Sequence, residues 1–202
     1  MRKIAAGLFM SLDGVIADPQ DWHFPYFDDA MGAAVDAQLG SADTLLLGRV
    51  TYDSFAGAWP GREAEGGPDA PFAKKLGDAR KLVVTHEDRD FPWRNSERLD
   101  GDLTASAAEL RKGSGGDIAI SGSVSVVRQL LAAGLLDELH LLVHPIVVGK
   151  GERLFEDGTT IPLRLLSSET FGTGVLHLVY TKDDTAPSGS YEDAKTHLAQ
   201  EE

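Results

Sequence analysis

Two short glycine-containing segments have residue types suited to binding phosphate, and each follows an apolar run and precedes a helix-like run. They are Gly48-Arg49-Val50-Thr51 and Ser121-Gly122-Ser123-Val124-Ser125. A helix N-terminus offers unpaired N–H groups and a positive dipole end, and glycine lets a phosphate approach the backbone. Arg49 adds a planar, charged donor. The alternative is that both glycines only permit turns and that Ser123 caps a helix.

Other known site patterns are absent or incomplete in the sequence. Neither turn has the six-position glycine fingerprint of a Rossmann fold, and Gly149-Lys150-Gly151 lacks the flanking residues of a P-loop. His140 and His144 have metal-ligand spacing for a helix, but their segment has the pattern of a strand. The chain has no cysteine, which excludes disulfides, cysteine zinc sites and thiol nucleophiles. We therefore expect no metal site.

The elements that must position these residues follow from hydrophobic periodicity. Strand-like runs cover residues 4–10, 44–47, 81–85, 118–120 and 138–144, and helix-like runs cover 28–39, 51–55, 72–76, 103–111 and 124–133. Residues 163–168 and 175–181 have the pattern of a closing β-hairpin, and 57–70, rich in glycine, proline and acid, of an exposed loop. Alternating strands and helices predict an α/β fold with a mixed, mostly parallel sheet and a C-terminal antiparallel hairpin.

Composition limits the partners and the location. The chain has 202 residues, with 19 Lys and Arg against 32 Asp and Glu, and a net charge of -13 disfavours nucleic-acid binding. No apolar stretch approaches the roughly 20 residues of a membrane span, and the N-terminal apolar run ends too early for a signal peptide. Together with the absence of cysteine, this favours a cytoplasmic protein. We expect one domain over residues 1–182 and an acidic tail over 183–202, with one frayed helix over 191–199.

Several segments, in the same order along residues 2–182, resemble the dihydrofolate-reductase-like superfamily. The branch with the greatest similarity is the C-terminal reductase domain of the bifunctional deaminase/reductase of riboflavin biosynthesis. The segments that carry the resemblance are Ser11-Leu12-Asp13-Gly14-Val15-Ile16-Ala17 after the first strand, Leu46-Leu47-Gly48-Arg49-Val50-Thr51-Tyr52, Ile120-Ser121-Gly122-Ser123, and Leu136-Asp137-Glu138-Leu139-His140 leading to Pro145-Ile146-Val147-Val148-Gly149-Lys150-Gly151.

The resemblance implies helices on both faces of the sheet and NADPH as cofactor. In that family the first glycine turn contacts the cofactor phosphates, the second supplies backbone N–H groups, the end of the third strand holds adenosine, and the loop after the first strand covers the nicotinamide. By position these candidates are Gly48, Arg49 and Thr51; Gly122, Ser123 and Val124; Thr85 and His86; and Val15 and Ile16. For Thr85 and His86, an ordinary strand end is the alternative.

The substrate side follows from the stretch Trp22-His23-Phe24-Pro25 before Asp28. It resembles the dihydrofolate reductase stretch in which Trp-x-x-Pro precedes a pterin-binding carboxylate, although the acid here stands one position later. Asp28 is accordingly the catalytic candidate, as ligand of an amino-pyrimidine edge and proton donor. Its alternative role is a carboxylate at a helix N-terminus. Trp22, Lys150 and Arg153 are the remaining substrate candidates.

The resemblance implies a stand-alone NADPH-dependent reductase of a pyrimidine- or pteridine-like substrate. The first activity to test is reduction of 5-amino-6-(5-phosphoribosylamino)uracil. Dihydrofolate reduction is one alternative, and a non-catalytic, nucleotide-binding or dimerising module is the other, because a fold does not guarantee an activity. The apolar runs 139–143 and 146–148 favour a homodimer, as is frequent in the family.

Overall fold

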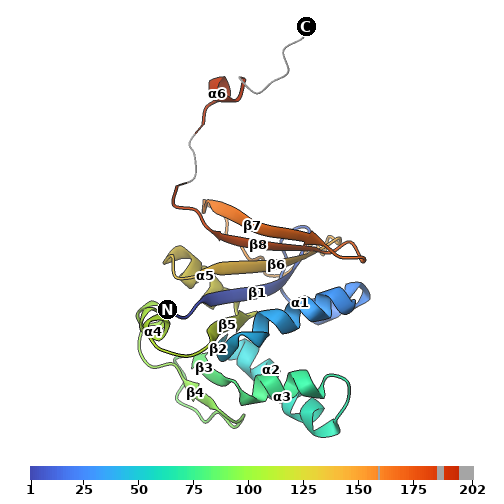
Figure 1. Cartoon of the computed structure of the whole chain (residues 1–202), viewed down its shortest axis with the longest axis vertical. Coiled ribbons are helices and arrows are strands. Elements are labelled where there is room, and N and C mark those ends of the chain that lie inside the picture. The colour runs from blue at the N-terminus through green and yellow to red at the C-terminus, as the bar shows by residue number, and fades with distance from the viewer. Residues whose placement is uncertain (159, 186–188, 196–202) are drawn as a thin grey trace.

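The computed structural model describes residues 1–158, 160–185 and 189–195, and its centre is a single eight-stranded sheet (Figure 1). The strand order is β4-β3-β2-β5-β1-β6-β8-β7. The strands are β1 Ile4–Ser11, β2 Ala42–Gly48, β3 Arg80–Val84, β4 Ser96–Arg98, β5 Asp117–Ser121, β6 Glu138–His144, β7 Leu163–Thr170 and β8 Leu176–Lys182. From β4 to β6 all neighbours are parallel, whereas β8 and β7 are antiparallel. The predicted mixed sheet with a C-terminal hairpin is confirmed.

Helices cover both faces of the sheet, as the resemblance implied. They are α1 Asp29–Gly40, α2 Arg49–Glu65, α3 Ala70–Asp78, α4 Leu103–Lys112 and α5 Val124–Ala132, with α6 Tyr191–Lys195 beyond the sheet and two 3-10 turns, η1 Pro19–Asp21 and η2 Phe24–Tyr26. Alternate residues of β2 show the two faces: Leu46 packs with residues of α4 and α5, and Leu45 and Leu47 pack with residues of α1, α2 and α3. Both faces are therefore buried.

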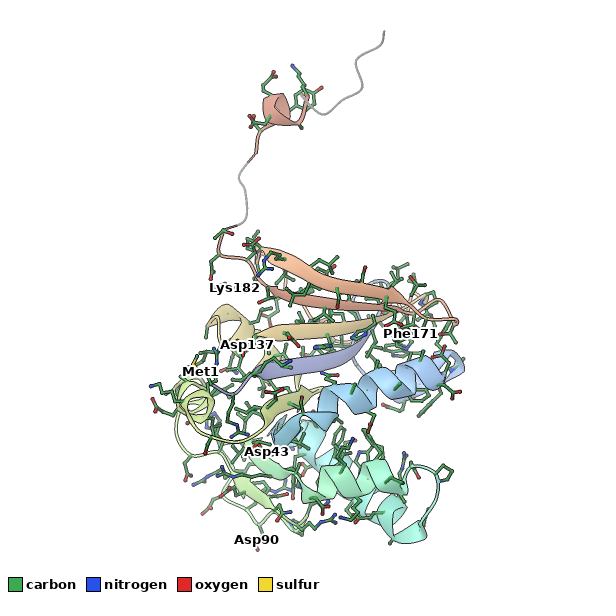
Figure 2. The ribbon with its side chains drawn as sticks, viewed as in Figure 1. Met1, Asp43, Asp90, Asp137, Phe171 and Lys182 are labelled. Carbon is green, nitrogen blue, oxygen red and sulfur yellow. The ribbon has the colours of Figure 1, made fainter. Side chains whose placement is uncertain are left out.

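A third cluster of buried apolar side chains holds α1 against β6 and the β7–β8 hairpin. Met31 of α1 packs with Leu142 of β6, and with Phe171 and Val175 of the hairpin between β7 and β8. Phe171 and the end of β8 at Lys182 are labelled in Figure 2. This contact positions α1 beside the carboxyl end of β1.

The prediction of an exposed loop over residues 57–70 is wrong. Helix α2 continues to Glu65 with Pro60 inside it and ends at Gly66, which has a left-handed φ of 73°. The ring centroid of Trp59 lies 5.2 Å from that of Phe72 in α3. This aromatic contact stabilises the helix despite the low helix propensity of its glycines and proline, because packing of one face outweighs local propensity.

Two further segments differ in extent from the expectations. Strand β4 was not expected, because Ser96–Arg98 has no apolar pattern; it forms by parallel pairing with β3. At the C-terminal end, α6 covers the first part of the helix expected over 191–199, and residues 196–199 lie outside the described residues. In the described part of the chain, no helix combines the length and apolarity that crossing a membrane requires. The division into a domain and a tail stays a prediction.

Candidate functional site

The two glycine turns lie side by side because they follow adjacent parallel strands. Strand β2 pairs with β5, so the turns at their carboxyl ends meet at one edge of the sheet. The N–H of Gly48 donates to Oγ of Ser123 at 2.9 Å, and the N–H of Ser123 donates to Oγ1 of Thr51 at 3.1 Å. These reciprocal hydrogen bonds join the N-termini of α2 and α5 into one unit.

The unit leaves some backbone donors free and engages others. Gly122 donates its N–H to the carbonyl of Gly7 at 3.3 Å, and the N–H of Ser123 is bound to Thr51. Within the described residues, no acceptor is found for the N–H groups of Val124 and Ser125 in the first turn of α5. The hydroxyl of Thr51 accepts one hydrogen bond and still has its own proton to donate. The open N-terminus of α5 and the Thr51 hydroxyl therefore suit an anionic ligand.

Both turns border a cavity of about 1350 Å³. It is an open cavity lined by β1 and the loop after it, by α1, α2, α3 and α5, and by the ends of β3 and β5. Of the cofactor candidates, those that line it are Ile16, Gly48, Arg49, Thr51, Thr85, His86, Gly122, Ser123 and Val124. Val15 does not, because its side chain is fully buried and its backbone forms a bridge with Arg153.

Arg49 lies on the cavity wall between two carboxylates. Its guanidinium is 3.3 Å from Asp53 and 3.1 Å from Glu87, and its side chain is 42% exposed. Arg89 binds the same Asp53 at 2.6 Å, and this hydrogen bond is the main cause that lowers the pKa of Asp53. These two contacts leave N–H donors of the guanidinium for a phosphate, but both carboxylates oppose an anion there by charge repulsion.

The loop after β1 is held by Asp13. Its carboxylate accepts hydrogen bonds from the Ser11 hydroxyl at 2.7 Å and from the N–H groups of Val148 and Gly149 at 3.0 and 2.9 Å. These bonds lower the pKa of Asp13 to about 2, with the Ser11 hydroxyl contributing most. The ionised carboxylate thus connects this loop to the segment after β6, and Ile16 extends from the loop to the cavity.

The catalytic and substrate candidates lie elsewhere. Oδ1 of Asp28 accepts a hydrogen bond from the N–H of Met31 at 2.9 Å, so Asp28 caps α1, the alternative role considered from the sequence. Trp22 is buried, and its Nε1 donates to the carbonyl of Ala17. Arg153 donates to the carbonyl of Asp13 at 3.0 Å. None of these three, nor Lys150, lines the cavity. Their catalytic and substrate roles stay predictions.

Sequence reasoning missed His23, which lines the cavity. Its side chain is 6% exposed, and its ring lies between those of Phe9 and Phe24, with centroid distances of 4.4 and 4.2 Å. Burial lowers the pKa of His23 to about 4, with a smaller contribution from His144, so the imidazole is neutral at pH 7. The only signal in the sequence is a histidine inside an aromatic run, which is equally typical of a core residue.

Metal binding has no support in the side-chain arrangement. Across the described ranges there is no cluster of three or more His, Asp or Glu side chains suited to holding an ion. His140 and His144, at metal-ligand spacing in the sequence, lie on β6 instead of a helix. Nδ1 of His140 is 3.1 Å from Nε2 of His177, and Nδ1 of His144 donates to the carbonyl of Leu142.

Known proteins have similar sequences and folds. The chain is 30% identical over 184 residues to the uncharacterized protein YyaP of Bacillus subtilis, covering 89% of this chain and 94% of that protein. A protein of Shewanella sp. PV-4 with a provisional riboflavin-biosynthesis name superposes with a TM-score of 0.70 at 21% identity, over 90% of this chain and 99% of that one.

A dihydrofolate reductase from Enterococcus faecalis, solved with NADP(H), shares the fold. Its TM-score is 0.57 at 16% identity, over 90% of this chain and 97% of that one. The expected dihydrofolate-reductase-like fold is confirmed. The sequence model of the RibD C-terminal domain matches residues 2–177, nearly the whole of the sheet and its helices. The chain therefore belongs to the RibD C-terminal domain family.

Proposed function

We propose that this protein is an NADPH-dependent reductase that transfers a hydride to a pyrimidine-like heterocycle. The observation that carries the proposal is the single cavity bordered by two joined helix N-termini, Arg49 and Thr51. Cavities for one small ligand usually measure about 300–1,000 Å³. At about 1350 Å³, this cavity has room for a dinucleotide and a second, smaller ring.

The residues present fit the dinucleotide. The N–H groups of Val124 and Ser125 and the Thr51 hydroxyl are donors for its pyrophosphate, and Arg49 is the cation for a phosphate group. Thr85, His86 and Ile16 line the same cavity; Thr85 and His86 would border the adenosine, and Ile16 would lie against the nicotinamide ring. When bound, NADPH supplies the hydride from its nicotinamide ring. The protein contributes orientation and the exclusion of water by the loop that Asp13 holds.

The geometry favours 5-amino-6-(5-phosphoribosylamino)uracil reduction over dihydrofolate reduction as the first activity to test. The carboxylate expected to bind a pterin, that of Asp28, caps a helix and does not line the cavity. The alternative outside the enzymes is a nucleotide-binding module without catalysis. A measurement of turnover, described below, separates this module from a reductase. A homodimer, the cytoplasmic location and the absence of a nucleic-acid partner stay predictions.

The test measures NADPH and NADH binding by isothermal titration calorimetry for the wild type and for Arg49→Ala. Hydrogen bonds to charged groups contribute about 1.5–3 kcal/mol, so the variant should bind NADPH about tenfold or more weakly, with a smaller effect on NADH. Arg80→Ala is the matched control, because Arg80 also forms an exposed ion pair, with Glu97 at 2.6 Å, but does not line the cavity. NADPH carries a 2′-phosphate that NADH lacks, so equal losses for both nucleotides would show that Arg49 does not bind this group.

A second variant tests the competition at Arg49. Glu87→Gln removes a carboxylate that holds the guanidinium, and we expect it to raise NADPH affinity several-fold. Turnover is then followed as loss of the reduced-nicotinamide absorbance with the phosphoribosylaminouracil and with dihydrofolate. Absence of NADPH binding by the wild type would refute the proposed function.

A further inference from the structure

One buried side chain on the cavity wall, that of His23, has no hydrogen-bond partner among the described residues. Both ring nitrogens of His23 are without a hydrogen bond among the residues that the structure describes, and Nδ1 is completely buried. Nearly all buried polar atoms in folded proteins have a hydrogen-bond partner. Nδ1 has no surface on the cavity, so the nitrogen that a ligand can reach is Nε2, and a polar group bound there would be a partner that the free protein does not contain.

The surroundings of His23 define what this partner is. Phe24 and Phe27 line the same cavity and are 59% and 48% exposed, so aromatic surface is accessible to a ligand that enters it. The His23 ring lies at 4.2 Å from Phe24 and at 6.0 Å from Phe27, measured between centroids. Such a surface suits a flat ring, which packs against aromatic faces, with a polar edge directed at the imidazole.

The imidazole is neutral, and this restricts the polar edge. A neutral imidazole has one N–H donor and one acceptor, whereas a carboxylate has acceptors only. The nitrogen that a ligand can reach, Nε2, can therefore donate to a ring C=O or accept from a ring N–H, but it gives no ion-pair energy to a protonated amino-pyrimidine. The low pKa of His23 keeps this neutral form over the physiological pH range.

The position of His23 relative to the phosphate-binding unit follows from β1. The His23 ring stacks on Phe9, and the carbonyl of Gly7 accepts the N–H of Gly122 in the second glycine turn. Phe9 and Gly7 are two residues apart on one face of β1, about 7 Å along the strand. His23 and the second glycine turn thus contact residues of β1 that are two positions apart, and both line the same cavity.

We propose that His23 is the residue that hydrogen-bonds the substrate ring, and that Phe24 and Phe27 form the surface on which that ring packs. The proposal rests on the proposed function, because it assigns the substrate side of the same cavity. The substrate contact expected from the charged Asp28 is thereby assigned to the neutral His23 instead. His23 is then a substrate-positioning residue for which the sequence motif offered no role.

The test uses 5,6-diaminouracil as a neutral probe and 2,4-diaminopyrimidine as its more basic counterpart. Binding of each is measured by calorimetry to the full chain, with and without saturating NADPH. The variants are His23→Phe, which keeps an aromatic ring and removes both nitrogens, and His23→Gln, which keeps a donor and an acceptor. Asp28→Asn is the matched control, because asparagine also caps helices.

We expect the wild type to prefer 5,6-diaminouracil. His23→Phe should weaken its binding about tenfold, His23→Gln less than threefold, and neither should change NADPH binding more than twofold. Asp28→Asn should change neither the binding of 5,6-diaminouracil nor that of NADPH. The ring nitrogen shifts of His23 in a 15N spectrum should move when the probe is added, which a purely structural role would not produce.

The proposal is overturned if the wild type binds neither probe, if His23→Phe binds 5,6-diaminouracil as the wild type does, or if Asp28→Asn loses binding instead. Should His23→Phe fail to fold, the spectrum of the wild type and the affinity of His23→Gln decide. If NADPH does not bind but the probe binds through His23, the proposed function fails while the assignment of His23 stands.

Discussion

Replacement of Ser123, where the two glycine turns join, separates two opposing contributions to stability: a hydrogen bond to its hydroxyl and a strained backbone. The Ser123 hydroxyl accepts the N–H of Gly48 at 2.9 Å, but the residue has a left-handed backbone with φ and ψ both 55°. Ser123→Ala loses the hydrogen bond and keeps the strained conformation. Ser123→Gly loses the same bond but adopts this conformation without steric cost.

The magnitudes follow from these two effects. Loss of the acceptor for Gly48 costs about 1–2 kcal/mol, because the partly buried N–H is left unpaired. Removing the Cβ from a left-handed residue returns about 1 kcal/mol. We therefore expect Ser123→Ala to lower the unfolding free energy by about 1.5 kcal/mol, or the melting temperature by about 3–6 °C. Ser123→Gly should lie within about 1 kcal/mol of the wild type.

The assay is urea unfolding at pH 7 together with NADPH titration. Both variants should bind NADPH more weakly, because each removes one of the two hydrogen bonds that hold the Gly48 turn to α5. Ser168→Ala is the control, since Ser168 is exposed, does not line the cavity and has no partner for its hydroxyl among the described hydrogen bonds. Equal destabilisation by alanine and glycine would refute the strain at Ser123, and unchanged stability in both would refute the hydrogen bond.

Two further outcomes concern buried ionisable side chains. The folded pKa of His23 is about 4 against 6.5 unfolded, so its contribution to stability is complete above pH 6.5 and is lost as the pH falls toward 4, about 2 kcal/mol of it by pH 5. Urea titrations at pH 7 and 5 should show this loss in the wild type and a smaller one in His23→Phe; the same loss in both would contradict it. Lys81 is fully buried, and its ammonium donates to three carbonyls at the end of α3 and lies 4.3 Å from the Trp93 ring centroid. Lys81→Met should lower the unfolding free energy by about 3 kcal/mol, because these carbonyls lose a charged donor, and a change below 1 kcal/mol in the same unfolding assay would be evidence against this role.

The parts of the fold that were predictable are those whose signal is local. Apolar runs such as Leu45 to Leu47 and Ile118 to Ile120 indicated strands, and glycines after them indicated the turns that open α2 and α5. The order of these elements along the chain also carried the family resemblance. The residues of these turns that line the cavity, Arg49 and Thr51 among them, were therefore named as candidates from the sequence, and their binding role stays a prediction.

The extent of α2 was decided by tertiary contacts. Residues 57–65 have glycine and proline, which disfavour a helix locally, yet Trp59 packs on Phe72 and Arg62 lies 4.8 Å from the Trp59 ring centroid. Local propensities differ by only about 1 kcal/mol per residue apart from proline. Burial of one large aromatic side chain exceeds such a difference, so packing that the sequence does not display can determine the conformation.

The sequence by itself indicated most of the elements and their order, and it marked candidate phosphate-binding residues at two turns. Only the tertiary structure decided that these turns bind each other through Ser123 and Thr51, that Asp28 caps a helix, and that His23 lies on the cavity wall. Periodicity and turn chemistry act over a few residues, so they can be read along the chain. The direction of one side chain depends on neighbours such as Phe9 and Phe24, and on a strand register that forms only when distant segments pack together.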